Sequence, residues 1–365
     1  MNLNTIQNYI FHKLDRPLFG ALILILIIGL INLISANHQD FSNTISHIVN
    51  IIIGIIFLYV TCNIQTRTIL VFAPWTYSIG IFLLIYVNLF GIESHGAQRW
   101  INLGIFNLQP SEILKISLPL MLAWFYQKCA SKINYRVHFI GGLLIFLPFY
   151  LITTQPDLGT SLLILFGGLT IIFLAGLPTK FIISSFIGLL ISSPFIWNSL
   201  LNYQKERILS LIDPFSDPYG AGYHSIQSMI AVGHGGIFGR GWLNGEQTNL
   251  RFLPETTTDF VFSVFSEEFG FFGVLAIISI YIFMFYRCMW MVSKMQDTFS
   301  RLAAAGLTIS LFVSLIVNIG MISGILPVVG VPLPFFSYGG SSMVVSLISI
   351  GIIMNLYSNK SLIAN

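Results

Sequence analysis

Residues 17–36 read PLFGALILILIIGLINLISA, an apolar run without a charged side chain. A helix needs about 20 such residues to cross the ~30 Å hydrocarbon core of a bilayer. Because lipid offers no hydrogen bonds to the main chain, a segment that crosses it must be helical. The run predicts a membrane-spanning helix, and since it lacks an A-x-A cleavage site we expect it to be retained rather than removed as a signal peptide.

Nine further apolar runs follow along the chain. They cover residues 44–62, 69–90, 111–127, 137–153, 158–176, 180–201, 265–287, 302–325 and 339–357. The composition agrees, because 55% of the 365 residues are hydrophobic and only 8% are charged, against roughly 25% in soluble domains. The sequence predicts an all-α polytopic membrane protein of about ten transmembrane helices in a single domain over 1–365. The net charge of +3 includes no basic run suited to nucleic acid.

One long polar segment interrupts this pattern. Residues 202–264 separate the first seven spans (1–201) from the last three (265–365) and hold ten of the 31 charged residues, 17 basic and 14 acidic. With the N-terminus inside, eleven Lys and Arg lie on the cytoplasmic side and five outside. The positive-inside rule therefore places both termini in the cytoplasm and the large loop outside. Its glycine-rich stretch 233–239 matches no phosphate-binding motif and predicts tight turns that let the main chain approach another surface.

A few ionisable residues lie inside or beside the spans, where they are costly and often functional. Glu112 and Lys115 share one face of the fourth span because they are three residues apart. Either they form a buried ion pair that fixes helix packing, or Lys115 faces a polar cavity and binds an anion. Asp157 precedes the sixth span and is either a helix cap or part of a site.

Asp259 ends the motif FLPETTTDF at 252–260, just before the eighth span. A carboxylate beside apolar Phe260 and Phe262 is partly desolvated, which raises its pKa and suits it to act as a general base. The alternative is that it caps the eighth span. Trp100, beside Arg99 in the first outer loop, is also typical of an interfacial aromatic belt.

The chain resembles the SEDS family, the shape, elongation, division and sporulation proteins. The resemblance rests on GAQRWI at 96–101, QPSEILK at 109–115, TQPDLGT at 154–160, DP at 213–214, GAGYH at 220–224, PETTTDF at 254–260, GILPVVGVPLP at 324–334 and SYGGSS at 337–342. These motifs occur in the family's order over nearly the whole chain. One departure is Thr257, where many members have histidine; no role is assigned to that position.

The resemblance implies a peptidoglycan glycosyltransferase that polymerises lipid II into a nascent glycan strand at the outer face of the membrane, paired with a class B penicillin-binding protein. It assigns the catalytic carboxylate to Asp259. Further family positions around the outward-facing cavity are Arg99, Trp100, Glu112, Lys115, Asp157, Ser337, Tyr338, Gly339, Gly340 and Ser341. The motif wording favours an elongation member over a division paralogue.

The implied chemistry fits these residue types. Lipid II is α-linked and the strand is β-linked, so a single inverting displacement needs one base on the acceptor hydroxyl. The departing undecaprenyl pyrophosphate needs positive charge, which could come from Lys115, Arg99, Lys205, Arg207 or Arg251. A divalent cation, Mg²⁺ or Mn²⁺, could share this task on Glu255 or Asp259 with substrate oxygens, although the sequence holds no dedicated metal cage and no cofactor is assigned.

Two other functions stay open at this level. A lipid II flippase would need polar residues through the bilayer midplane, whereas the charges of this chain cluster at the outer ends of the spans. A non-catalytic scaffold for the penicillin-binding protein would tolerate replacement of Asp259. An enzyme would lose strand synthesis when Asp259 is replaced, whereas strands that persist unchanged would favour the scaffold or the flippase.

Overall fold

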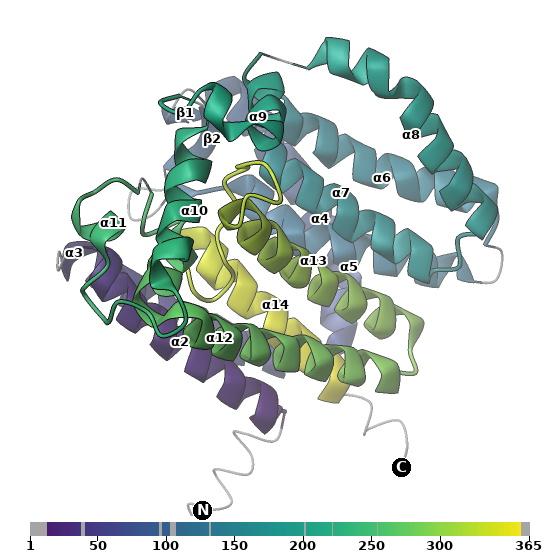
Figure 1. Cartoon of the computed structure of the whole chain (residues 1–365). Helices are drawn as coiled ribbons and strands as arrows, with labels where there is room; N and C mark the ends of the chain where they lie inside the picture. The colour runs from purple at the N-terminus through teal and green to yellow at the C-terminus, as the bar shows by residue number, and fades with distance from the viewer. Residues whose placement is uncertain are drawn as a thin grey trace, which may run out of the picture.

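The computed structural model describes residues 13–37, 41–94, 97–102, 107–130, 133–200, 202–220, 222–253 and 255–358. The chain is nearly all helical there (Figure 1). Its ten long helices are α2 (Arg16–Ala36), α3 (Phe41–Asn63), α4 (Thr66–Phe90), α5 (Pro110–Lys128), α6 (Tyr135–Thr153), α7 (Leu158–Leu174), α8 (Thr179–Ser199), α12 (Val261–Lys294), α13 (Thr298–Ile322) and α14 (Gly340–Ser358). Each begins within four residues of a predicted run.

The helices differ in how well they suit a membrane. Seven of those described are long and apolar enough to cross one, namely α2, α3, α4, α6, α12, α13 and α14. Helix α7 is apolar but has only 17 residues. The all-helical, membrane-spanning class is therefore confirmed, and the count of ten spans stays a prediction.

The C-terminal helices form the centre of the bundle. Helix α14 packs along α3, α13 packs against both α5 and α7, and α4 packs along α5. Figure 1 shows α13 and α14 surrounded by the earlier helices, with α8 at the edge of the bundle. This arrangement brings the start of α12 together with the C-terminal end of α13 and the loop that follows it, which lie much later in the sequence.

Buried polar groups tie helix ends at one side of this bundle. Asp15 caps α2 and receives two hydrogen bonds from the guanidinium of Arg287 on α12, at 2.7 and 3.1 Å. Asn355 of α14 is fully buried, and its amide nitrogen shares its two hydrogens among the carbonyls of Thr61, Cys62 and Ile64 at and just beyond the end of α3. These contacts satisfy main-chain carbonyls that a helix end leaves without partners.

The segments predicted as outer loops contain helices and strands. Strands β1 (Ile92–Ser94), β2 (Ala97–Asn102) and β3 (Asn107–Leu108) form a small antiparallel sheet in the order β1-β2-β3. The segment between α8 and α12 contains α9 (Asn202–Ile212), the short helix η2 (Pro214–Ser216), α10 (Tyr223–Gly235) and α11 (Glu246–Asn249). Helix α10 packs against α12, so the predicted large loop is a folded layer.

This layer packs against α12 at a break in that helix. Gly270 has φ 63° and ψ −164° inside the helix, and Gly239 opposite it has φ 81°. The main-chain amide of Arg240 donates to the carbonyl of Glu267 at 3.0 Å, and that of Phe271 donates back to Gly236 at 2.9 Å. A side chain at either glycine would overlap the opposite main chain. The predicted close approach of the glycine-rich stretch is confirmed.

Candidate active site

Asp259 lies in the turn that leads into α12. Its side chain is half-buried, and the residue that caps α12 is Phe260, so the interpretation of Asp259 as a helix cap is wrong. The main-chain carbonyl of Asp259 accepts a hydrogen bond from Asn318 of α13 at 3.0 Å. Its carboxylate faces Gly330, where a Cβ would lie 3.3 Å from Oδ2. The side chain therefore lies between the start of α12 and the loop before α14.

The charges around Asp259 shift its proton affinity. Burial and then the negative charges of Glu255 and Asp157 raise the pKa of its carboxyl, the positive charge of Arg207 lowers it, and the net result is a pKa of about 6. Two carboxylates and one guanidinium thus act on the carboxyl of Asp259. A carboxylate with a pKa of about 6 is ionised at neutral pH and is still a better base than an ordinary aspartate.

Asp157 and Arg99 organise the turn before α7. Asp157 is 5% exposed; it caps α7 by accepting from the amide of Thr160 at 3.1 Å, and its other oxygen accepts from the side chain of Gln109 at 3.1 Å. The guanidinium of Arg99 donates to the carbonyls of residues 155 and 156, at 3.1 and 2.6 Å. The predicted cap is confirmed. Trp100 follows Arg99 on β2 and pairs with Ile92 of β1.

Glu112 and Lys115 form the predicted buried ion pair. Their charged atoms are 2.6 Å apart, and the side chains are 5% and 17% exposed. Lys115 also reaches a cavity of about 30 Å³, large enough to hold water. The serines that line it are Ser310, Ser314, Ser337, Ser342, Ser346 and Ser349. The buried ion pair is confirmed, and Lys115 also lines this cavity, while its role in binding an anion stays a prediction.

The 337–341 segment contacts the Asp259 turn through one residue. The amide of Tyr338 donates to the carbonyl of Thr257 at 2.9 Å, and its ring lies 5.7 Å from that of buried His47 on α3. The hydroxyl of Ser337 accepts from the amide of Leu333 at 2.8 Å. The remaining predicted positions, Gly339, Gly340 and Ser341, lie at the start of α14.

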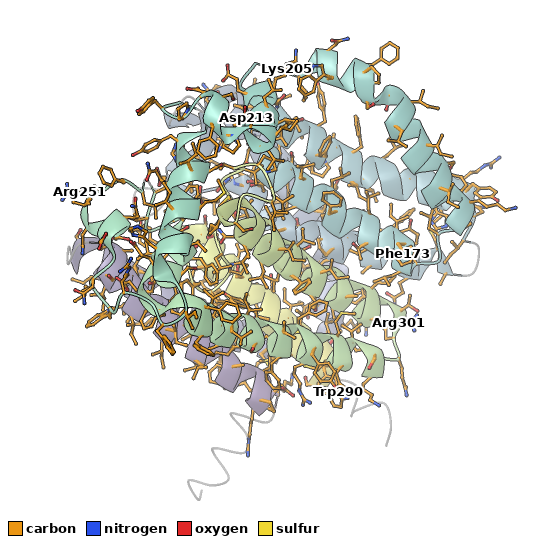
Figure 2. All side chains as sticks on the ribbon, in the orientation of Figure 1. Phe173, Lys205, Asp213, Arg251, Trp290 and Arg301 are labelled. Atoms are coloured by element: carbon orange, nitrogen blue, oxygen red, sulfur yellow. The ribbon has the colours of Figure 1, made fainter. Side chains whose placement is uncertain are left out.

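The predicted cations of the outer layer do not all meet at Asp259. Of Lys205, Arg207 and Arg251, the structure gives an electrostatic effect on Asp259 for Arg207. Figure 2 shows Lys205 on α9 and Arg251 on the far side of α10, at the outer edge beside α11. Arg251 is exposed and has φ 57°. We therefore place Arg207 in the site and leave Arg251 outside it.

Sequence reasoning missed two residues beside Asp259. The ring of His224 on α10 stacks on Phe260, with centroids 5.9 Å apart and planes at 17°; burial and Arg207 lower its pKa, and Glu255 raises it. Asn318 is fully buried in α13. An asparagine inside an apolar span was the available signal, since such side chains commonly bond across helices. Among the described residues no group of three or more His, Cys, Asp or Glu is arranged to hold a metal.

Comparison with known sequences agrees with this geometry. Residues 14–362 match the family of cell cycle proteins that comprises FtsW, RodA and SpoVE. The chain is 43% identical over 352 residues to the peptidoglycan glycosyltransferase MrdB of Escherichia coli K12, covering 96% of this chain and 95% of that protein. Sequence similarity thus extends through the α12 start, the 326–338 loop and all the site residues.

Solved structures share the fold. One is a chain of a peptidoglycan synthase complex that coordinates polymerization and crosslinking. It superposes with a TM-score of 0.83 at 29% identity, covering 95% of this chain and 98% of that one. The rod shape determining protein RodA of Thermus thermophilus superposes with a TM-score of 0.73 at 26% identity, covering 95% and 97%. With the family match over nearly the whole length, the chain belongs to the SEDS family of FtsW, RodA and SpoVE.

Proposed function

We propose a mechanism for this peptidoglycan glycosyltransferase of the inner membrane, in which Asp259 is the general base. Its acceptor substrate would be the sugar at the end of a growing strand or of a second lipid II. The carboxylate takes the proton from the 4-hydroxyl as that oxygen attacks the anomeric carbon of the donor. The bond from that carbon to the pyrophosphate breaks in the same displacement, so the configuration inverts.

The observation that carries the proposal is the environment of Asp259. Asp259 is half-buried, and burial together with two acidic neighbours raises its pKa to about 6. Such a carboxylate binds a proton more tightly than an exposed one. Base assistance of this kind is typically worth about 10²–10⁴-fold in rate. The leaving pyrophosphate needs no proton, because it is already a weak base.

Positive charge near Asp259 would stabilise the leaving pyrophosphate. Arg207 is the outer-layer cation that acts on Asp259, and we assign it this role. Lys115 is held by Glu112 at the polar cavity and would orient a substrate oxygen there. Arg99 acts indirectly, because its guanidinium donates two hydrogen bonds to the turn that carries Asp157.

A divalent cation fits the charge of the site. Glu255 and Asp157 both disfavour the ionised form of Asp259, and an ion bound by Glu255 and Asp259 would relieve that repulsion. Since those two carboxylates offer few ligands for Mg²⁺ or Mn²⁺, substrate oxygens would complete the shell. Such an ion would supply charge stabilisation to the leaving group.

The proposal also assigns a side of the membrane and a partner. The excess of Lys and Arg on the loops of one side supports cytoplasmic termini, which puts the α9–α11 layer and Asp259 on the extracytoplasmic face. The likeness to a polymerising and crosslinking complex supports a class B penicillin-binding protein as the partner. The similarity to MrdB and RodA supports a role in cell elongation.

Polymerisation of fluorescent lipid II by the purified protein with its transpeptidase partner tests the proposal. We expect Asp259→Asn to abolish glycan strands while the variant stays folded and partner-bound. Asp213→Asn is the matched control, because Asp213 caps η2 in the same outer layer, and it should polymerise normally. Strands of wild-type length and yield from Asp259→Asn would reject the mechanism and favour a scaffold.

A further inference from the structure

One side-chain amide joins the Asp259 turn to the loop before α14. Nδ2 of Asn318 donates to the carbonyl of Asp259 at 3.0 Å and to the carbonyl of Val331 at 2.7 Å. An amide nitrogen carries two hydrogens, so both are used. The side chain is fully buried. Two main-chain segments that are distant in sequence are therefore held at a single atom.

The oxygen of the same side-chain amide differs from the nitrogen in its hydrogen bonding. Oδ1 of Asn318 is buried without a hydrogen-bond donor among the described residues. Asn355, by contrast, shares its two amide hydrogens among three nearby carbonyls and accepts at its oxygen from Thr66 at 3.1 Å. Because an unpaired buried carbonyl lowers stability, stability explains an asparagine at 355 better than it explains one at 318.

The position of the carboxylate depends on this contact. Gly330 directly precedes Val331, has φ 72°, and approaches Asp259 so closely that a Cβ would be 3.3 Å from Oδ2. Two residues beyond Asp259, Asn32 of α2 donates to the carbonyl of Val261 at 2.8 Å. The main chain is thus bound on both sides of Phe260, and the Gly330 loop forms one wall at the carboxylate.

We infer that Asn318 is a positioning residue for the Asp259 base, which it holds against the Gly330 loop in the orientation that meets the acceptor hydroxyl. The inference rests on the proposed function, because it presupposes that Asp259 takes the proton. Four other groups act on this turn: Glu255 within it, Asp157 before α7, Arg207 of α9, and His224 of α10 through Phe260. Asn318 differs from them in fixing position without contributing charge.

The test compares Asn318→Leu with Asn355→Leu in lipid II polymerisation with the transpeptidase partner. Both changes replace a buried asparagine by an apolar side chain of similar size and release main-chain carbonyls. We expect Asn318→Leu to lower kcat about 10- to 100-fold, since misplacement of a catalytic group by ~1 Å costs about 10²-fold. The KM for lipid II should stay within about 2-fold, and Asn355→Leu should keep the wild-type kcat.

A pH profile separates positioning from mere loss of stability. Release of the turn would hydrate the carboxylate, so the acid limb of kcat in Asn318→Leu should shift below its wild-type midpoint. Asn318→Gln retains the amide one methylene further out and provides the same test if the leucine variant does not fold. Wild-type kcat and an unshifted acid limb in the folded variant, or an equal loss in Asn355→Leu, would overturn the inference.

Asp259→Asn, assayed in parallel, distinguishes the two proposals. If that variant is inactive and Asn318→Leu behaves as wild type, the role of Asn318 alone is rejected. If Asp259→Asn is itself fully active, the proposed base is rejected, and the inference falls with it. Loss of activity in both, with the acid limb shifted in Asn318→Leu, supports both.

Discussion

The ammonium of Lys115 lies 2.6 Å from the carboxylate of Glu112, one turn earlier on α5, and the pair is almost enclosed by helices. Removing one partner of a buried pair leaves an uncompensated charge and typically costs about 3–5 kcal/mol, whereas replacing both is often far less harmful. We therefore expect Lys115→Met to melt at a lower temperature than the double variant Glu112→Gln/Lys115→Met. Thermal unfolding in detergent measures this, and equal melting points for the two would contradict it.

The pH dependence of polymerisation should follow the carboxyl of Asp259. Only the ionised form accepts a proton, so kcat/KM, which reports the free enzyme, should be half-maximal near pH 6 and fall about tenfold per unit at lower pH. Initial rates between pH 4.5 and 8.5 measure the limb. A midpoint near 4, the ordinary value for aspartate, would show that the site does not shield this group.

Stability should respond in the opposite sense. Because folding raises the pKa of Asp259 from 3.8 to about 6, the folded state favours the protonated form. The resulting stabilisation is fully present below pH 3.8 and is lost as the pH rises through 6. At pH 7.5 we expect the neutral variant Asp259→Asn to be inactive yet at least as heat-stable as wild type. A large fall in melting temperature would mean that the carboxylate is structural.

Two arginines of the outer layer provide a matched comparison. Arg207 lowers the pKa of Asp259, so Arg207→Gln should raise the midpoint of the acid limb as well as lower kcat through weaker binding of the leaving group. Arg251 is exposed at the edge of the layer, so Arg251→Gln should change neither. Parallel pH profiles check both, and indistinguishable variants would remove Arg207 from the site.

The break in α12 predicts an unequal response to alanine. At Gly270 a methyl group would meet the main chain of Gly239, and its φ of 63° is unfavourable for alanine. Strain of this kind costs about 1–3 kcal/mol, so Gly270→Ala should lower stability and activity together. Gly142 of α6 has open space around it, and Gly142→Ala should be neutral or slightly stabilising. Melting temperatures of the two variants give the answer.

The helices could be predicted from sequence because lipid imposes one rule on every span. Apolar runs located each long helix, and Asp157 could be identified as a cap from its place before such a run. The secondary structure within 202–260 could not be predicted in the same way, since α9, α10 and α11 are short, and α10 and α11 are held by contacts with α12. The predicted span 265–287 also began too late, because residues 261–264 are buried by protein rather than by lipid.

The site was only partly predictable for the same reason. Asp259 and the Glu112–Lys115 pair stand out as charges in apolar surroundings, and the family motifs assigned Asp259 its role. The separation of Arg207 from Arg251 depends on how α9 and α11 fold back, which no local pattern records. Asn318 was not identified as a site residue because its partners are main-chain carbonyls of distant segments. Every residue type has such a carbonyl, so the sequence does not indicate which ones accept a hydrogen bond.

The docking of the outer layer on α12 through main-chain atoms affects how the sequence can diverge. Amides and carbonyls at 236–241 hold the layer, whereas the side chain of Ile237 is 60% exposed. Phe238 is also exposed, but its ring packs against Phe272 of α12 with centroids 5.5 Å apart. An exchange at Ile237 alters the exposed surface and leaves the main-chain contacts in place, whereas an exchange at Phe238 also changes the contact with Phe272. Lineages can thus adapt this surface to different neighbouring proteins while the geometry at Asp259 is inherited unchanged.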